Sequence, residues 1–146
     1  MSCINRRGTL QILSVDRLGN QAILVGNSQL QLNEILVNPC ALWDAALFRF
    51  IPRTSGYYLV TVQATFTSCQ VGRTYSVYVY VNPAIPLTIS TVTGAILNGT
   101  ITINAQCLIW VNKNGFLDAG ISTSNPAGGT VQGGNHSTFL EAVKVN

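Results

Sequence analysis

Charged side chains are scarce in this chain of 146 residues. Only 9% of its residues are Asp, Glu, Lys or Arg, while 47% are hydrophobic; ordinary soluble domains carry about 25% charged residues. A surface so poor in charge is expected to be covered by other subunits or by a partner. The alternative is a monomer whose surface is solvated by the abundant Ser, Thr, Asn and Gln side chains.

Residues that commonly perform catalysis or bind metals are also few. The chain has a single histidine, His136, and five dispersed acidic residues, whereas acid–base catalysis usually draws on histidine or paired carboxylates. Motifs for serine nucleophiles, phosphate-binding loops and dinucleotides are absent. None of the four cysteines forms a CxxC pair, which argues against zinc. We therefore expect no enzyme activity, no cofactor and no metal; Asp44 and Asp118 are the candidates if calcium binds.

Long hydrophobic segments are missing as well. No run of apolar residues reaches the length of a membrane-spanning helix, and the N-terminal sequence MSCINRRGTLQ has no apolar core of the kind found in signal peptides. The net charge of +3 is not gathered into a dense basic stripe with interleaved aromatics. We expect a protein made in a cytoplasm, with neither a membrane nor a nucleic acid as its partner.

The clearest pattern that is present is an alternation of period two. In the segment YYLVTVQATF (57–66), apolar side chains alternate with Thr and Gln, which predicts a strand with one buried face. Pro52 and Gly56 predict a turn before it. Similar short segments recur without a long amphipathic helix between them, which predicts an all-β sandwich or barrel. The predicted strands are Thr9–Val15, Gln21–Val25, Leu30–Val37, Leu47–Phe50, Tyr57–Thr67, Thr74–Val81, Leu87–Thr93, Ile96–Ile103, Cys107–Val111, Phe116–Ser122 and Thr138–Val145.

Three connections between these strands have distinctive sequences. Asn98-Gly99 and Asn114-Gly115 have the composition of primed two-residue turns and predict β-hairpins. Ser122–Gly134 contains four glycines and one proline, and we expect it to be a long surface loop.

Four segments occur in an order that is typical of a known family. They are LNEILVN (32–38), FRFIPRTSGYYLVTVQATF (48–66), LIWVNKNGFLDAGI (108–121) and HSTFLEAVKV (136–145). Together they resemble the C1q/TNF-like jelly rolls over residues 32–145. The chain departs from that family in lacking collagen repeats and in having Asn114-Gly115, with Asp118 displaced, where a Gly-Asp turn is usual. The resemblance implies an all-β, C1q/TNF-like jelly-roll sandwich.

The resemblance also implies an oligomeric state. Members of this family associate as homotrimers through aromatic and aliphatic residues of one sheet, and tyrosine is well suited to such an interface. We expect the five tyrosines to form the trimer interface: Tyr57, Tyr58, Tyr75, Tyr78 and Tyr80. The alternative is that these tyrosines cover the edge of the core of a monomer.

The first twenty residues differ from the rest, because they combine arginines with only one short apolar run. We interpret residues 1–20 as an N-terminal arm and residues 21–146 as the jelly-roll domain. Arg6, Arg7 and Arg17 would allow the arm to bind an acidic protein surface. The alternative is that the segment contains the first strand of the sandwich.

The combined expectations point to a structural role. The low charge, the basic arm and the resemblance suggest a non-enzymatic viral protein: a trimeric capsid decoration or cement protein on the head of a bacteriophage, whose arm binds the major capsid protein. The alternative is a receptor- or glycan-binding tip module of a tail fibre or adhesin, in which Trp43, Trp110 and the Ser122–Gly134 loop would contact the ligand. A secreted signalling-type ligand is a third hypothesis, disfavoured by the N-terminal sequence.

Overall fold

The computed structural model describes residues 11–38, 42–81 and 85–145, which form strands, turns and loops without a helix. This confirms the prediction of an all-β protein. The strands are β1 (Ile12–Asp16), β2 (Gln21–Ile23), β3 (Gly26–Gln29), β4 (Glu34–Val37), β5 (Trp43–Asp44), β6 (Arg49–Phe50), β7 (Gly56–Cys69), β8 (Thr74–Val81), β9 (Ile85–Thr93), β10 (Gly99–Val111), β11 (Leu117–Thr123), β12 (Gly129–Val131) and β13 (Phe139–Lys144).

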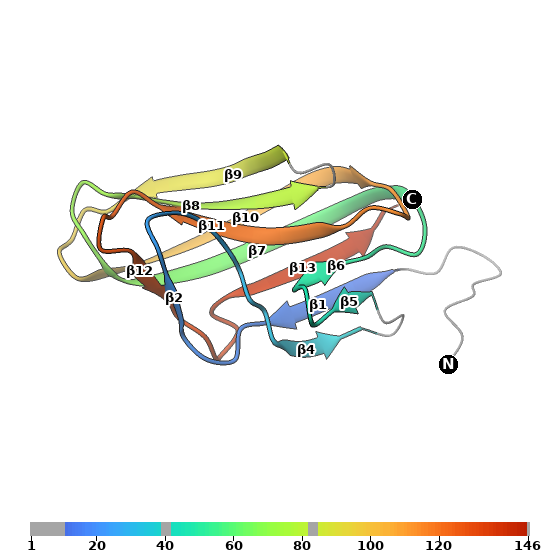
Figure 1. Ribbon diagram of the computed structural model, residues 1–146, viewed down its shortest axis with the longest axis horizontal. Helices are drawn as coiled ribbons and strands as arrows, with labels where there is room; N and C mark the ends of the chain where they lie inside the picture. Colours follow the sequence, from blue (N-terminus) through green and yellow to red (C-terminus); the bar gives the residue numbers. More distant parts are fainter. Residues whose placement is uncertain (1–10, 39–41, 82–84, 146) are drawn as a thin grey trace.

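The strands form two antiparallel sheets, one in front of the other (Figure 1). Sheet A has the order β2-β12-β7-β13-β1-β4, with β10 on the other side of β7. Sheet B has the order β5-β6-β11-β8-β9, and β3 also pairs with β11. In the view of Figure 1, sheet B lies nearer to the reader and the longer strands run along the long axis of the molecule.

The core lies between the sheets and is built by alternate residues of the long strands. On β7, the side chains of Tyr58, Val60 and Phe66 are fully buried, and on β8 those of Val77 and Val79 are fully buried. Burying one such side chain contributes about 1.5–3 kcal/mol. The alternation predicted for residues 57–66 is therefore confirmed, and its buried face is the inner face of sheet A.

Strand β1 is an integral part of sheet A. It lies between β13 and β4 and pairs with both, and the side chains of Leu13 and Val15 are completely buried in the core. The proposed domain boundary at residue 20 is therefore wrong, and the alternative, a first strand of the sandwich, holds for Ile12–Asp16. Residues 1–10 lie outside the described residues.

The connections differ from those expected. The two predicted strands Ile96–Ile103 and Cys107–Val111 are joined in one long strand, β10, which begins at Gly99 after a turn over residues 96–98 and pairs along its length with β7. Asn98-Gly99 and Asn114-Gly115 consequently join strands of different sheets and form no two-residue hairpin. The expected loop Ser122–Gly134 contains the strand β12, which pairs with β2 and β7.

Candidate functional site

The outer face of sheet A carries a compact group of exposed apolar side chains. Opposite positions on β7 and β10 bring Tyr57 beside Trp110 and Leu59 beside Leu108. The two aromatic rings meet edge to face with their centroids 5.1 Å apart. These four side chains, which we call the aromatic patch, are 37–59% exposed. Contiguous exposed apolar groups of this kind mark interaction sites on soluble proteins.

The same two strands become polar beyond the patch. The amide of Gln106 donates to the hydroxyl of Thr61 at 3.0 Å, and the amide of Asn104 donates to the side-chain oxygen of Gln63 at 2.9 Å. These cross-strand hydrogen bonds satisfy the outward polar groups within the subunit. The aromatic patch is thus confined to one end of the outer face of sheet A.

His136 lies on this outer face between two carboxylates. Its Nδ1 is 2.9 Å from both carboxylate oxygens of Asp16, and its Nε2 is 3.6 Å from Oε1 of Glu141. The imidazole also stacks on the ring of Phe139, with centroids 3.8 Å apart. Because Nε2 faces a carboxylate rather than a hydroxyl or thiol, the cluster does not have the arrangement that activates a nucleophile.

Three of the five tyrosines expected at a trimer interface are buried within the subunit. Tyr58 and Tyr75 point into the core, and Tyr78 lies across Gly120 on the outer face of sheet B; each is at most 2% exposed. The interface prediction is therefore wrong for these three, because a covered side chain presents no surface to a second subunit. Tyr57 belongs to the aromatic patch, whereas Tyr80 lies on sheet B, on the opposite side of the sandwich.

Of the three arginines assigned to the arm, Arg17 is within the part of the chain that the structure describes. All three side-chain nitrogens of Arg17 donate to backbone carbonyls of its own subunit: Nε to Gly19 at 2.7 Å, Nη1 to Gln31 at 2.7 Å and Nη2 to Asn20 at 3.2 Å. Arg17 thus holds the β1–β2 turn in place. Arg6 and Arg7 lie outside the described residues.

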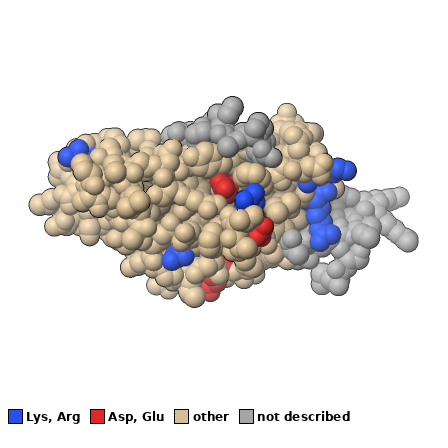
Figure 2. All heavy atoms as spheres, in the orientation of Figure 1, with Lys and Arg blue, Asp and Glu red and all other residues tan. Residues whose placement is uncertain are grey.

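The outer face of sheet B carries charges in its middle. The pairing of β6, β11 and β8 places Arg49, Asp118 and Tyr80 side by side across three neighbouring strands, and we call them the Arg49–Asp118–Tyr80 row. Asp44 on β5 lies beyond Arg49. On this face, Figure 2 shows a basic group between two acidic ones near the centre, surrounded by uncharged atoms.

The side chains around Asp118 are held in place by specific contacts. Gln29 donates from Nε2 to Oδ2 of Asp118 at 3.0 Å, and the guanidinium carbon of Arg49 lies 4.2 Å from the centroid of the Phe116 ring. Burial raises the pKa of the Asp118 carboxyl to about 6, against the opposing effects of the Gln29 hydrogen bond and the Arg49 charge. Burial likewise raises the pKa of the Tyr78 hydroxyl, which donates to the carbonyl of Ser28 at 3.2 Å.

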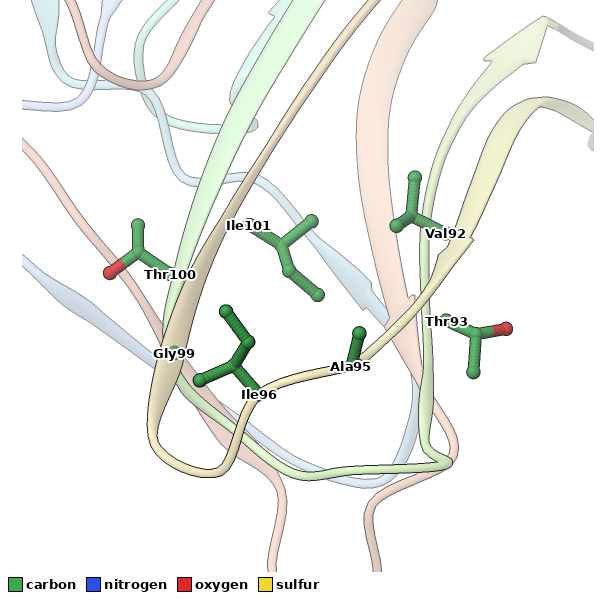
Figure 3. A pocket seen from close by; sticks show the side chains of 7 residues that line it. All are labelled: Val92, Thr93, Ala95, Ile96, Gly99, Thr100 and Ile101. Atoms are coloured by element: carbon green, nitrogen blue, oxygen red, sulfur yellow. The ribbon is translucent and has the colours of Figure 1, made fainter.

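An open pocket of about 200 Å³ lies between the end of β9 and the start of β10 (Figure 3). Ile96 and Ile101 point into it, whereas Thr93 and Thr100 point away. The residues that line it include no ionisable side chain. This pocket therefore offers mainly apolar contact and no charged side chain to orient a ligand.

Other expected sites are not assembled in the described part of the chain. Within it, no group of three or more metal-binding side chains occurs, and no helix is long and apolar enough to cross a membrane. Asp44, a calcium candidate, accepts hydrogen bonds from the backbone amides of Ala46 and Leu47.

Trp43, a candidate for glycan contact, is buried in the core, which excludes that role. Cys69 and Cys107 are free thiols.

Comparison with known proteins identifies the fold. No protein family description matches the sequence, and no curated protein is significantly similar to it. Among solved structures, the globular domain of zebrafish complement 1qA protein matches with a TM-score of 0.70 at 10% identity, over 94% of this chain and 98% of that one. The fold is that of the C1q/TNF-like jelly rolls. The same share of this chain matches Eiger TNF from S. frugiperda (TM-score 0.68, 8% identity, 93% of that chain) and murine APRIL at pH 5.0 (0.67, 12%, 100%).

Sequence reasoning missed two parts of the outer faces. The pairing of Leu59 with Leu108 was not predicted. The sequence does contain a signal for it, because Leu108 and Trp110 are two residues apart and therefore lie on the same face of a strand. The Arg49–Asp118–Tyr80 row joins residues that are far apart in the sequence, and no local motif predicts that they lie side by side.

Proposed function

We propose that this chain is a non-enzymatic structural protein that assembles as a homotrimer through the outer face of sheet A and decorates a viral shell. The observation that carries the proposal is the aromatic patch. Its side chains are large, adjacent and substantially exposed, so their removal from water would stabilise an assembly.

The rest of the molecule supports self-association through this surface. Polar groups next to the patch on β7 and β10 bond to one another and form the kind of polar rim that surrounds an apolar interface centre. The scarcity of charge over the whole chain lowers the cost of covering this face. Tyr57 belongs to the aromatic patch and is the tyrosine that we keep in the proposed trimer interface.

Decoration of a shell explains why a trimer would be useful. A trimer can bind a regular shell through three weak contacts at once. Its overall affinity exceeds that of one contact, because the second and third contacts form at high effective concentration. The proposed partner is the major capsid protein at the head surface of a bacteriophage. Arg6 and Arg7 remain the proposed capsid-binding residues. Arg17 is no longer proposed for that role, because its guanidinium donates to backbone carbonyls of its own subunit.

The first test is the molar mass in solution, measured by light scattering with and without reductant. We expect three times the 15.7 kDa of one chain for the wild type and a single-chain mass for Leu108→Ser/Trp110→Ser. Ile96→Ser/Leu97→Ser is the matched control, because it removes two exposed apolar side chains from a loop outside the patch. A monomeric wild type, or equal masses for both variants, would refute the trimer.

The second test separates decoration from the alternative, a receptor- or glycan-binding module. The trimer should sediment with empty phage heads and not with host cells if it decorates the shell. Trp110 favours the alternative in one respect, since an exposed tryptophan suits stacking on a ligand. Sedimentation with cells alone would therefore replace decoration by receptor binding.

A further inference from the structure

Basic side chains gather at one end of the sandwich, around the loop that leads into β7. Three residues from distant parts of the sequence meet there: Arg53 in the β6–β7 loop, Lys113 in the β10–β11 loop and Lys144 at the end of β13. Arg53 and Lys113 are exposed, and Lys144 is half-buried. We call these three residues the basic end.

Hydrogen bonds to Thr54 and Ser55 hold the basic end together. Lys144 donates from Nζ to Oγ1 of Thr54 at 2.8 Å. The backbone amide of Lys113 donates to Oγ of Ser55 at 2.9 Å. Because Arg53 directly precedes Thr54 in the chain, all three cationic residues are fixed around one short stretch of the β6–β7 loop.

The N-terminal segment joins the sandwich at this same end. Gln11 donates from Nε2 to Oγ1 of Thr54 at 2.8 Å, and its carbonyl accepts from the backbone amide of Lys144 at 2.9 Å. Arg6 and Arg7 precede Gln11 by only a few residues. Five of the eight basic residues in the chain are therefore either in the basic end or close to it along the sequence.

The acidic side chains lie in other parts of the fold. Among the described residues, neither lysine of the basic end forms an ion pair with a carboxylate. Figure 2 shows basic atoms gathered at the right of this view and acidic atoms only nearer the centre. The acidic residues are Asp16 and Glu34 at the end of β1 remote from Gln11, Asp44 and Asp118 on sheet B, and Glu141 beside His136.

This arrangement differs from that of an ordinary solvated surface. Charges that keep a protein dissolved are usually of both signs and spread over the molecule, whereas here they are scarce and the cations are gathered. Neighbouring cations repel one another. Lys144 uses one of its three N–H donors on a neutral hydroxyl, so a bound carboxylate would both accept from the remaining donors and reduce the repulsion.

We propose that the basic end binds a carboxylate-rich segment of a protein partner through ion pairs with Arg53, Lys113 and Lys144. A protein is favoured over a nucleic acid, because these cations surround one loop at the end of a sandwich and do not form a stripe that follows a phosphate backbone. The identity of the partner as a shell protein rests on the proposed function, whereas the acidic character of its surface does not.

The basic end stays accessible in the proposed trimer. Lys113 lies beyond the last residue of β10. Lys144 lies opposite Tyr58, whose side chain points into the core, and is therefore not on the outer face of sheet A. Each trimer presents three basic ends, and this repetition matters because exposed ion pairs are individually weak.

The experiment is an NMR titration of the full chain with an oligoglutamate peptide, and with an oligoglutamine peptide of the same length as the uncharged control. We expect only the acidic peptide to shift the amide signals of Ser55, Lys113 and Lys144. Binding should weaken as salt is added, because salt screens the attraction between exposed charges.

A pair of variants with the same change in net charge tests whether binding is local. Arg53→Gln/Lys113→Gln should weaken the affinity for oligoglutamate about fivefold, as expected for the loss of two exposed ion pairs. Arg73→Glu is the matched control, because it also lowers the net charge by two but lies in an exposed turn at the other end of β7. It should bind more tightly than the double variant and shift the same signals as the wild type.

Thermal melts show whether the double variant is folded. If it is not, Lys113→Gln alone decides, because it leaves the backbone hydrogen bond to Ser55 in place. Shifts centred on Arg49 or Arg73, equal binding of the two peptides, or equal affinities in the site variant and Arg73→Glu would each overturn the proposal. Tighter binding of an oligothymidylate at the same residues would overturn it in favour of a nucleic acid.

Sedimentation with empty phage heads separates this inference from the proposed function. If the heads retain Arg53→Gln/Lys113→Gln as well as they retain the wild type, decoration stands and the basic end has no part in it. If oligoglutamate binds at the basic end but the protein does not sediment with heads, the basic end stands and the shell is not its partner.

Discussion

The outer faces of the two sheets differ, although the same core lies beneath both. On sheet A, large apolar side chains of the aromatic patch are exposed to water. On sheet B, a carboxylate is buried beside aromatic rings and a guanidinium. Both features cost free energy in an isolated subunit, the first because apolar surface is exposed and the second because charge is desolvated. The comparison teaches that, above one core, one outer face can leave apolar side chains open to water while the other buries a charged group beneath its own side chains.

The largest expected effect concerns the construction of sheet A itself. Deleting residues 1–16 should abolish folding, because it removes β1 from between β13 and β4 together with the buried side chains of Leu13 and Val15. Deleting residues 1–10 should leave the fold intact. Circular dichroism melts of the two proteins check this. A cooperative melt for the shorter chain would show that sheet A does not need β1.

The next prediction contrasts the two faces of β7. Tyr58→Ala should lower the free energy of unfolding by about 3–5 kcal/mol, because it leaves a cavity in the core. Tyr57→Ala should cost less than about 1 kcal/mol, because that ring is exposed on the aromatic patch. Urea unfolding of both variants, at a protein concentration low enough to give a single-chain mass, measures the difference without a contribution from assembly. Similar losses would mean that the patch stabilises the subunit rather than an assembly.

A third prediction tests how tightly the outer face of sheet B is packed. A Cβ atom at Gly120 would overlap the ring of Tyr78, so Gly120→Ala should destabilise the protein by about 1–3 kcal/mol through overpacking. Gly19→Ala is the control, because nothing lies within 4 Å of the position that its new methyl group would occupy. Equal unfolding midpoints for the two variants would show that Tyr78 is free to move.

The smallest effect is the pH dependence that Asp118 confers on stability. Its pKa is raised to about 6 in the folded protein, above the value of about 3.9 in an unfolded chain. The unfolded state then binds fewer protons between these two values, so stability falls as the pH rises from about 4 to about 6. After allowance for solvent screening, this loss is about 1 kcal/mol. Asp118→Asn should abolish it, and an unchanged profile in urea titrations would place the carboxyl in water.

Much of the fold could be predicted because its signals are local. The alternation over residues 57–66 identified β7 and its buried face, and the order of four segments indicated the C1q/TNF-like jelly roll. The extent of β10 could not be predicted, since its central residues Asn104–Gln106 interrupt the apolar pattern and are held by hydrogen bonds to β7. Asn-Gly turns were misassigned as hairpins for a related reason, because a turn sequence does not say whether its flanking strands pair.

The sequence by itself determined the class of the fold, the buried face of β7 and the unusual scarcity of charge. Only the tertiary structure decided which outward residues are available. Tyr75 and Tyr78 lie on the same predicted strand, yet one points into the core and the other covers Gly120 on a neighbouring strand. The physical reason is that the residues which face the core recur at every second position of a strand, and this period is visible in the local sequence. Whether a residue on the outer face is covered depends on which strands pair beside it, and those strands can be far away in the sequence.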